Sequence, residues 1–223
     1  MIKIGAITIG QSPRKDVTPD ILPILGDNIE LIQAGGLDGL TLDEIEKFAP
    51  VEGDYVLVSK LNDGTSVKFA EHHILSRLQQ CIYDLEEQGV KIIIFLCTGD
   101  FPLIFKSKVP LIFPCNILNA IVPVLACNSK IAVVTPDKMQ VKQSENKWKK
   151  YIKEVIPVPA SPYANSLELE EAAKVIRDLD VDLVVMDCIG YTEEMKQRLR
   201  EKTGKNIVLS RTILARIVRE LVD

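Results

Sequence analysis

Short apolar runs alternate along this chain with longer stretches in which apolar positions recur at helical spacing. The short runs are typical of buried parallel strands, and the longer stretches are typical of amphipathic helices. The pattern therefore predicts an α/β fold of stacked strand-helix units around parallel sheets. The expected strands are residues 2–9, 29–33, 91–96, 111–113, 130–135, 155–158, 182–186 and 206–209.

The clearest expected helices are residues 71–88, 136–151, 167–179, 192–202 and 212–221. Ser166 and Ser210 stand just ahead of two of them as N-cap residues. Residues 54–69 differ, because two apolar runs there flank the turn sequence Asn62-Asp63-Gly64, and glycine tolerates the positive φ of a tight turn. This segment is predicted to be a β-hairpin.

The chain has the pattern of an internal duplication. A strand ending in Thr8 opens the first half, and a similar strand ending in Thr135 opens the second. Each half then reaches a strongly apolar strand that leads to a cysteine, Cys97 or Cys188. We expect two pseudo-symmetric lobes, each a parallel sheet flanked by helices, with the hairpin inserted in the first. The expected first lobe comprises residues 1–118 and 209–223, and the second comprises residues 119–208.

Composition excludes several classes of protein. The 223 residues are 47% hydrophobic and 26% charged, with a net charge of -4, which fits neither a disordered chain nor a polybasic nucleic-acid binder. The sequence has neither the pattern of a secretory leader nor an apolar stretch long enough to cross a bilayer. We therefore expect a cytoplasmic protein with reduced thiols and no membrane or nucleic-acid partner.

The five cysteines make an odd count without a CxxC pair, which argues against a disulfide framework and against a thiolate-rich zinc site. Cys97 and Cys188 follow strands, and parallel sheets bind ligands beyond the carboxyl ends of their strands. Two thiols on opposite sides of a cleft suit proton transfer at carbon: one removes a proton and the other returns one. Such a pair should lie roughly 7 to 8 Å apart, with a substrate carbon between them.

Packing is the alternative for every cysteine, because cysteine is among the most buried residue types. Cys81, Cys115 and Cys127 are interpreted in this way. His72 and His73 are adjacent and cannot easily share a metal on a helix, so no metal site is expected. The lysine-rich segment 142–153 is interpreted as a solvated helix face with one packed aromatic residue, Trp148.

The loop after the first strand, residues 8–14, predicts an anion site. Ser12 suits an N-cap and Pro13 suits the first turn of a helix, so free amides would face the edge of the sheet. Arg14 adds a guanidinium that can clamp a carboxylate, although a solvated arginine is the alternative. The loop matches neither a GxGxxG nor a Walker pattern, so no nucleotide cofactor is expected.

Three segments together resemble the AroM family: residues 4–14, the turn at residues 61–64 and residues 186–190. More remotely, the two half-domains with a strand-terminal cysteine are similar to the aspartate/glutamate racemase superfamily. That superfamily implies a cofactor-independent racemase, isomerase or decarboxylase, and the resemblance allows a homodimer. Asp187 and Ile189 depart from its second Gly-Cys-Thr motif, which argues against amino-acid racemisation in particular.

The resulting hypothesis is a cofactor-independent enzyme that moves a proton at carbon in a small carboxylate, with Cys97 and Cys188 as catalysts. The alternative is a non-catalytic protein that binds an anionic metabolite linked to aromatic amino-acid metabolism. A thiol-redox or metal protein is a third interpretation, which needs the two sulfurs much closer together. The expected substrate-binding residues are Thr8, Gly10, Gln11, Ser12, Arg14, Thr98, Gly99, Thr135, Asp187 and Gly190.

Overall fold

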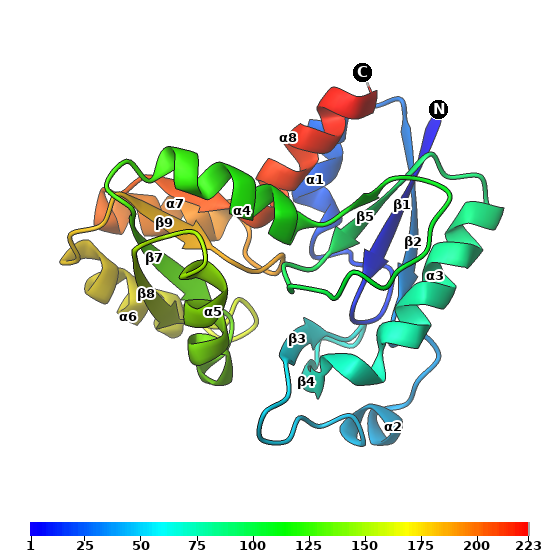
Figure 1. Cartoon of the computed structure of the whole chain (residues 1–223), viewed down its shortest axis with the longest axis horizontal. Coiled ribbons are helices and arrows are strands. Elements are labelled where there is room, and N and C mark those ends of the chain that lie inside the picture. Colours follow the sequence, from blue (N-terminus) through cyan, green and yellow to red (C-terminus); the bar gives the residue numbers. More distant parts are fainter. Residues whose placement is uncertain (223) are drawn as a thin grey trace.

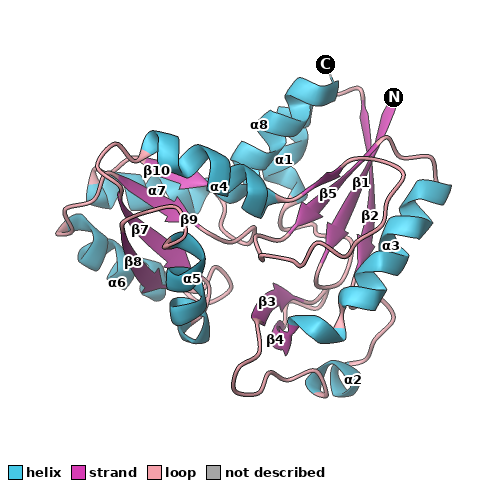
Figure 2. Cartoon of the chain, viewed as in Figure 1, coloured by secondary structure: helices cyan, strands magenta, loops and turns pink. Residues whose placement is uncertain are grey.

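The structure is a computed structural model that describes residues 1–222, and it contains two four-stranded parallel sheets, one in each of two lobes (Figures 1 and 2). The first sheet contains β1 (Ile2–Thr8), β2 (Ile29–Gly35), β5 (Ile92–Leu96) and β6 (Leu111–Ile112). The second contains β7 (Lys130–Thr135), β8 (Glu154–Pro159), β9 (Leu183–Met186) and β10 (Ile207–Leu209). All the predicted strands are present.

The two sheets have the same internal order. The strand that opens each half is central: β1 pairs with β2 and β5, and β7 pairs with β8 and β9. The last strand of each half, β6 or β10, lies at the edge beside β5 or β9. This equivalence confirms the predicted two pseudo-symmetric α/β lobes. The exact boundaries of the lobes along the chain stay a prediction.

The helices largely follow the apolar periodicity. Two 3-10 turns, η1 (Glu71–His73) and η2 (Lys138–Gln140), occupy the first turns of the predicted helices 71–88 and 136–151. Asn165, and not Ser166, caps its helix, because the Asn165 side chain accepts from the Leu167 amide. The helices are α1 (Thr18–Leu25), α2 (Leu42–Glu46), α3 (Leu75–Glu87), α4 (Pro114–Leu125), α5 (Val141–Trp148), α6 (Ser166–Arg177), α7 (Glu193–Thr203) and α8 (Ser210–Val222).

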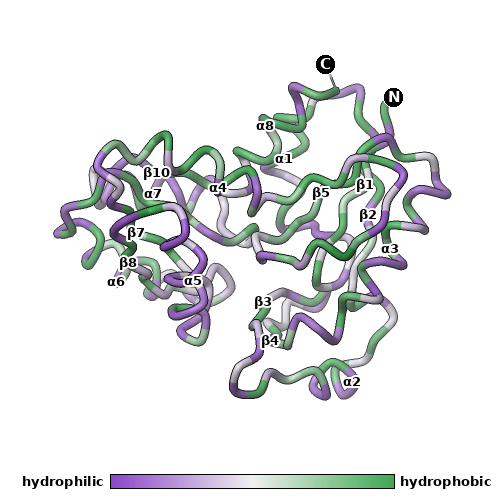
Figure 3. The backbone as a smooth tube through the Cα atoms, viewed as in Figure 1, coloured by the Kyte–Doolittle hydropathy of each residue, from purple (hydrophilic) through white to green (hydrophobic). Residues whose placement is uncertain are grey.

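The last helix of each lobe packs against the sheet of the other lobe. Helix α4 follows the first sheet, but Leu118 and Val122 of this helix pack in a buried cluster with Ile131 of β7. Helix α8 follows the second sheet, but its Leu214 packs with Ile4 of β1. Figure 1 shows α8 beside α1 on the first lobe. Because the sheets are covered on both faces, the inner strands β5 and β9 are apolar and buried along their whole length. Figure 3 shows the hydrophobic colour along β5.

The predicted hairpin is formed by β3 (Val56–Lys60) and β4 (Ser66–Ala70), which pair in antiparallel orientation. Gly64 in its turn has φ +94°, a backbone conformation that favours glycine. Leu57 of β3 and Phe69 of β4 belong to the first lobe's core. Within residues 1–222, no helix is both long and apolar enough to cross a membrane.

Candidate functional site

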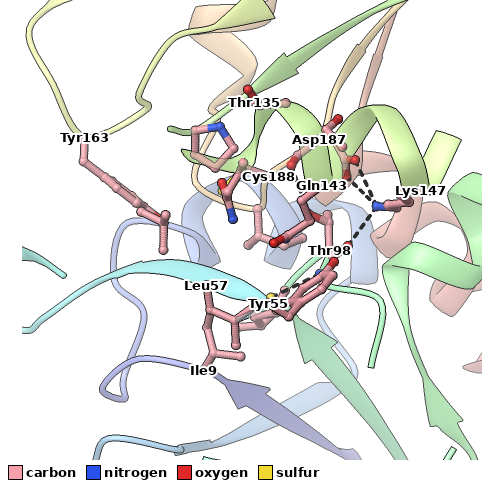
Figure 4. Close-up of a pocket in the computed structure, with 18 of the residues that line it drawn as sticks. Ile9, Tyr55, Leu57, Thr98, Thr135, Gln143, Lys147, Tyr163, Asp187 and Cys188 are labelled. Atoms are coloured by element: carbon pink, nitrogen blue, oxygen red, sulfur yellow. Dashed lines mark hydrogen bonds and ion pairs between the residues drawn. The ribbon is translucent and has the colours of Figure 1, made fainter. Parts of the chain in front are cut away.

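A cleft lies between the lobes at the carboxyl ends of the parallel strands (Figure 4). Its volume of about 50 Å³ is several times the ~10–15 Å³ that one water requires, so it suits a small molecule. The first lobe, the hairpin and helix α5 all contribute to its walls. The predicted site residues that line it are Arg14, Cys97, Thr98, Gly99, Thr135, Asp187 and Cys188.

Cys97 and Cys188 occupy equivalent positions after β5 and β9, and each residue is 8% exposed. The Gly99 amide donates to the sulfur of Cys97 at 3.3 Å, and the Gly190 amide donates to the sulfur of Cys188 at 3.3 Å. The same turn therefore recurs in both lobes, with an amide two residues beyond the cysteine directed at its sulfur. An N–H donor of this kind favours the thiolate over the thiol.

Burial works against that effect. Loss of solvent raises the pKa of the Cys97 thiol to about 12, although the Gly99 amide opposes the shift. Burial also raises the pKa of Cys188, while its Gly190 amide and the nearby Arg14 guanidinium act in the opposite direction. Both groups are therefore thiols at neutral pH, and a cation opposes the shift of each pKa: Lys147 for Cys97 and Arg14 for Cys188.

Thiol labelling should follow this difference in environment. Cys127 is exposed, so iodoacetamide at pH 8 should alkylate it at least ~100-fold faster than Cys97, whose raised pKa leaves little thiolate. Labelling of Cys97 should then rise by about tenfold for each pH unit up to its pKa. Peptide mass spectrometry measures both rates, and a Cys127→Ser variant is the control for the fast phase. Equal labelling of Cys97 and Cys127 at pH 8 would contradict the assignment.

A buried ion pair, Lys147 with Asp187, lies beside the two cysteine loops. Lys147 of α5 is 5% exposed and contacts both oxygens of the Asp187 carboxylate, at 3.1 and 2.9 Å. The Trp148 indole donates to the same carboxylate at 2.8 Å. Burial disfavours the charged lysine, but the adjacent Asp187 carboxylate holds the pKa of Lys147 above its ordinary value. Figure 4 shows this pair on the α5 side of the cleft.

Lys147 also connects the lobes. Its ammonium donates to the carbonyl of Thr98 at 2.9 Å, and the Thr98 hydroxyl donates to the carbonyl of Asp187 at 3.0 Å. Thr98 follows the first cysteine and Asp187 precedes the second, so these bonds fix the two cysteine loops relative to each other. The interpretation of 142–153 as a solvated face is wrong for Lys147. Ser144, Lys147 and Trp148 share the i, i+3, i+4 spacing of one buried face, which was the available signal.

Arg14 is neither a solvated arginine nor a free clamp. Its Nε and Nη2 donate to the Asp16 carboxylate at 2.8 and 2.7 Å, Nη2 also donates to the Tyr163 hydroxyl, and Nη1 donates to the Thr8 hydroxyl. Burial opposes its charge, but the hydrogen-bonded Asp16 holds the pKa of Arg14 above its ordinary value. One hydrogen on Nη1 is left, since a guanidinium has five N–H groups.

The prediction that Ser12 caps a helix is wrong. Helix α1 begins at Thr18, and the Ser12–Pro13 peptide bond is cis. The amide and hydroxyl of Ser12 donate to the Asp38 carboxylate at 2.7 and 2.6 Å, and the Gly35 amide donates to the same group. The anion beside this loop is therefore a carboxylate of the chain itself.

The remaining predicted site residues, Thr8, Gly10, Gln11, Ser12 and Gly190, are not among the residues that line the cleft. Gln11 bonds to the Leu40 carbonyl, and Gly10 lies so close to Ser59 that an added Cβ would be 2.2 Å from its hydroxyl oxygen. Thr8 supports Arg14, and Gly190 supports Cys188. Tyr55, Gln143 and Tyr163 line the cleft without having been predicted. Tyr55 precedes hairpin strand β3, Gln143 lies on α5, and Tyr163 lies in the loop between β8 and α6, so only the folded chain brings them together.

Among residues 1–222, no three His, Cys, Asp or Glu side chains come together in a group that could hold a metal ion. The rings of His72 and His73 are tilted by 41° to each other, His73 stacks on Phe48, and His72 lies 3.5 Å from Asp54. Cys81 and Cys115 are buried, as their interpretation as packing residues requires. The same interpretation is wrong for Cys127, which follows α4 at the exposed end of the helix.

Comparison with known proteins identifies both family and fold. A family model described as AroM protein matches residues 4–222. Solved structures similar to this chain include an allantoin racemase from Klebsiella pneumoniae, with a TM-score of 0.68 and 14% identity over 100% of this chain and 88% of the other. A Picrophilus torridus aspartate racemase has a TM-score of 0.63 and 13% identity, over 99% and 94%.

The maleate isomerase Iso from Pseudomonas putida S16 also has this fold, with a TM-score of 0.63 and 12% identity over 100% of this chain and 93% of the other. A search of curated proteins finds no match. At such identities the solved structures show a shared fold. The fold class expected from the two cysteine-terminated half-domains is thereby confirmed.

Proposed function

This chain belongs to the AroM family, and on that premise we propose that it is a cofactor-independent enzyme that transfers protons at a carbon atom of a small carboxylate. The observation that carries the proposal is the pair of equivalent cysteines, Cys97 and Cys188, which line one cleft from two lobes. Proteins named as racemases and an isomerase share this fold, which supports the same type of reaction.

The carboxylate would bind beside Arg14 and Tyr163. The Arg14 guanidinium retains one N–H on Nη1, and the Tyr163 hydroxyl accepts from Arg14, so its own hydrogen remains for a ligand. Burial raises the pKa of Tyr163, which keeps this hydrogen in place at neutral pH. Both donors would stabilise negative charge that develops on the carboxylate when the adjacent carbon loses its proton.

In the reaction, the Cys188 thiolate takes the proton from the carbon, and the electron pair of the broken C–H bond moves into the carboxylate. The Cys97 thiol then donates its proton to the opposite face of the carbon. After this step Cys97 is a thiolate and Cys188 is a thiol, and the reverse reaction exchanges the two roles. Arg14 beside Cys188 favours the starting thiolate at that position.

The test is exchange of a carbon-bound proton. The protein is incubated in D₂O with a panel of small carboxylates, and proton NMR follows loss of the signal from the carbon next to the carboxylate. We expect exchange at least ~100-fold above the protein-free rate for one member of the panel. The rate should rise with pH, because the thiolate is the base and its pKa is raised.

A non-catalytic site for an anionic metabolite is the second candidate, linked by the family resemblance to aromatic amino-acid metabolism. The raised pKa of both thiols favours it, because neither is a ready base in the free protein. Binding of a carboxylate without exchange at any pH between 7 and 10 would favour this candidate and contradict the enzyme.

A further inference from the structure

Three buried polar atoms on the second-lobe wall of the cleft have no hydrogen-bond partner in the protein. They are Oγ1 of Thr135, Oε1 of Gln140 and Oγ of Ser144, and all three residues line the cleft. Thr135 is 2% exposed and Ser144 is 6% exposed. Buried polar atoms without a partner are rare and costly, so a group that enters the cleft has a reason to bind them. We call these three residues the polar wall.

The orientation of the Gln140 amide is fixed by its surroundings. Its Nε2 donates to the carbonyl of Val56 in the hairpin at 2.8 Å. A carbonyl oxygen accepts and cannot donate, so Nε2 must face Val56 and Oε1 must be the unpartnered end. The polar wall therefore contains one obligatory acceptor, Oε1 of Gln140, and two hydroxyls that can donate.

No charge on the polar wall can balance a charged ligand group. Among the described residues that line the cleft, the cations Arg14 and Lys147 are each paired, with Asp16 and with Asp187. A carboxylate at the polar wall would place its oxygens against Oε1 of Gln140. A buried ammonium would have no anion to pair with, and an unpaired buried charge is costly. The favoured ligand group is uncharged and both donates and accepts.

We propose that the polar wall of Thr135, Gln140 and Ser144 binds an amide-type group of the substrate, a carboxamide or ureido group. Its N–H donates to Oε1 of Gln140, and its carbonyl accepts from the Thr135 and Ser144 hydroxyls. This inference rests on the proposed function, in which the carboxylate of the same molecule binds beside Arg14. The substrate is then a small monocarboxylate with an amide-type group, distinct from a dicarboxylate or a free amino acid.

The first experiment compares three probes of matched size: 2-methylmalonate, its monoamide and its diamide. Saturation-transfer NMR titrations give the dissociation constant of each with the intact chain. The monoamide should bind at least ~10-fold more tightly than the diacid and the diamide, since each lacks one of the two matched groups. Ser144→Ala should weaken binding of the monoamide by about 5- to 10-fold and leave the dissociation constant of the diacid unchanged. Equal affinities, or binding of none of the probes, overturn the proposal.

Binding and exchange are read separately in this experiment. Discrimination in favour of the monoamide without deuterium exchange supports the polar wall and contradicts the thiol chemistry. If the diacid exchanges its carbon-bound proton as fast as the monoamide and binds as tightly, the result supports the thiol chemistry and overturns the polar wall.

The second experiment asks whether the Thr135 hydroxyl has a structural task. Thr203→Val is the matched control, because its buried hydroxyl donates to the Leu199 carbonyl at 2.7 Å. The Thr203→Val control should lower Tm by about 2–4 °C, whereas Thr135→Val should leave Tm unchanged or raise it. Thr135→Val should also weaken binding of the monoamide. A loss of Tm in Thr135→Val as large as in the control, or unchanged monoamide binding, overturns the proposal.

Discussion

Replacement of either strand-terminal cysteine with alanine should lower turnover at carbon by at least ~100-fold, because one face of the substrate would lose its proton donor or acceptor. Cys97→Ala and Cys188→Ala should have similar effects, since the two residues occupy equivalent turns of equivalent strands. Turnover is followed by the change in optical rotation or proton NMR spectrum of a carboxylate that shows exchange in D₂O.

The matched control is Cys81→Ala. Cys81 is also a buried thiol of the first-lobe core, but it lies on α3 and is not among the residues that line the cleft. Its removal should leave turnover within about twofold while costing stability as any small core truncation does. Binding of the carboxylate should persist in Cys97→Ala. Full turnover in both cleft variants would contradict two-cysteine catalysis.

Lys147→Met should destabilise the protein by about 3–5 kcal/mol, the usual cost of leaving a buried charge without its partner. The variant removes the ammonium that contacts Asp187 and the Thr98 carbonyl, and Asp187 would keep only the Trp148 indole as a side-chain donor. Urea unfolding followed by circular dichroism measures the free energy of unfolding. The pKa of Lys147 is raised in the fold, so its contribution is present below its ordinary pKa and is lost as pH rises beyond it.

Two further variants sharpen this prediction. Lys149→Met, two residues along the same helix segment, removes an exposed lysine paired with Glu145 and should cost less than ~1 kcal/mol. Lys147→Met combined with Asp187→Asn should recover a large part of the loss, because no uncompensated charge remains. Equal destabilisation by Lys147→Met and Lys149→Met would contradict the buried pair.

The ion pair also bears on how the cleft is built. Each cysteine loop is short and comes from a different lobe, so the position of one loop relative to the other depends on contacts between the lobes. Two hydrogen bonds supply those contacts, one from the Lys147 ammonium to the Thr98 carbonyl and one from the Thr98 hydroxyl to the Asp187 carbonyl. Two more hold Lys147 on the Asp187 carboxylate, and all three residues are buried. Asp187 replaces the glycine expected from the racemase superfamily, and its partner is a lysine from α5.

Local patterns identified most of the fold. The strands, the hairpin with its Gly64 turn and the equivalence of β5 with β9 all follow from apolar runs and turn residues, which depend on neighbours in the sequence. The placement of Cys97 and Cys188 in one cleft was also predicted, because the carboxyl ends of parallel strands are where ligands bind. The roles of these cysteines stay a prediction.

The prediction was wrong where a side chain meets a distant partner. Ser12 has the residue type of a helix cap, but Asp38 captures its amide and hydroxyl, and helix α1 begins at Thr18. Lys147 belongs to a lysine-rich segment, and only the fold shows that Asp187 compensates its buried charge. No pattern of neighbouring residues reveals such partners, since the bonds join positions far apart along the chain.

By itself, the sequence determined the two-lobed α/β plan and the position of Cys97 and Cys188 at the ends of strands, because hydrophobic periodicity and strand termini are local properties. Only the tertiary structure decided which charges are neutralised in the cleft, with Arg14 held by Asp16 and Lys147 by Asp187. It alone also revealed the unpartnered oxygens of the polar wall. Charge balance and hydrogen-bond satisfaction depend on which groups the folded chain brings within about 3 Å of each other.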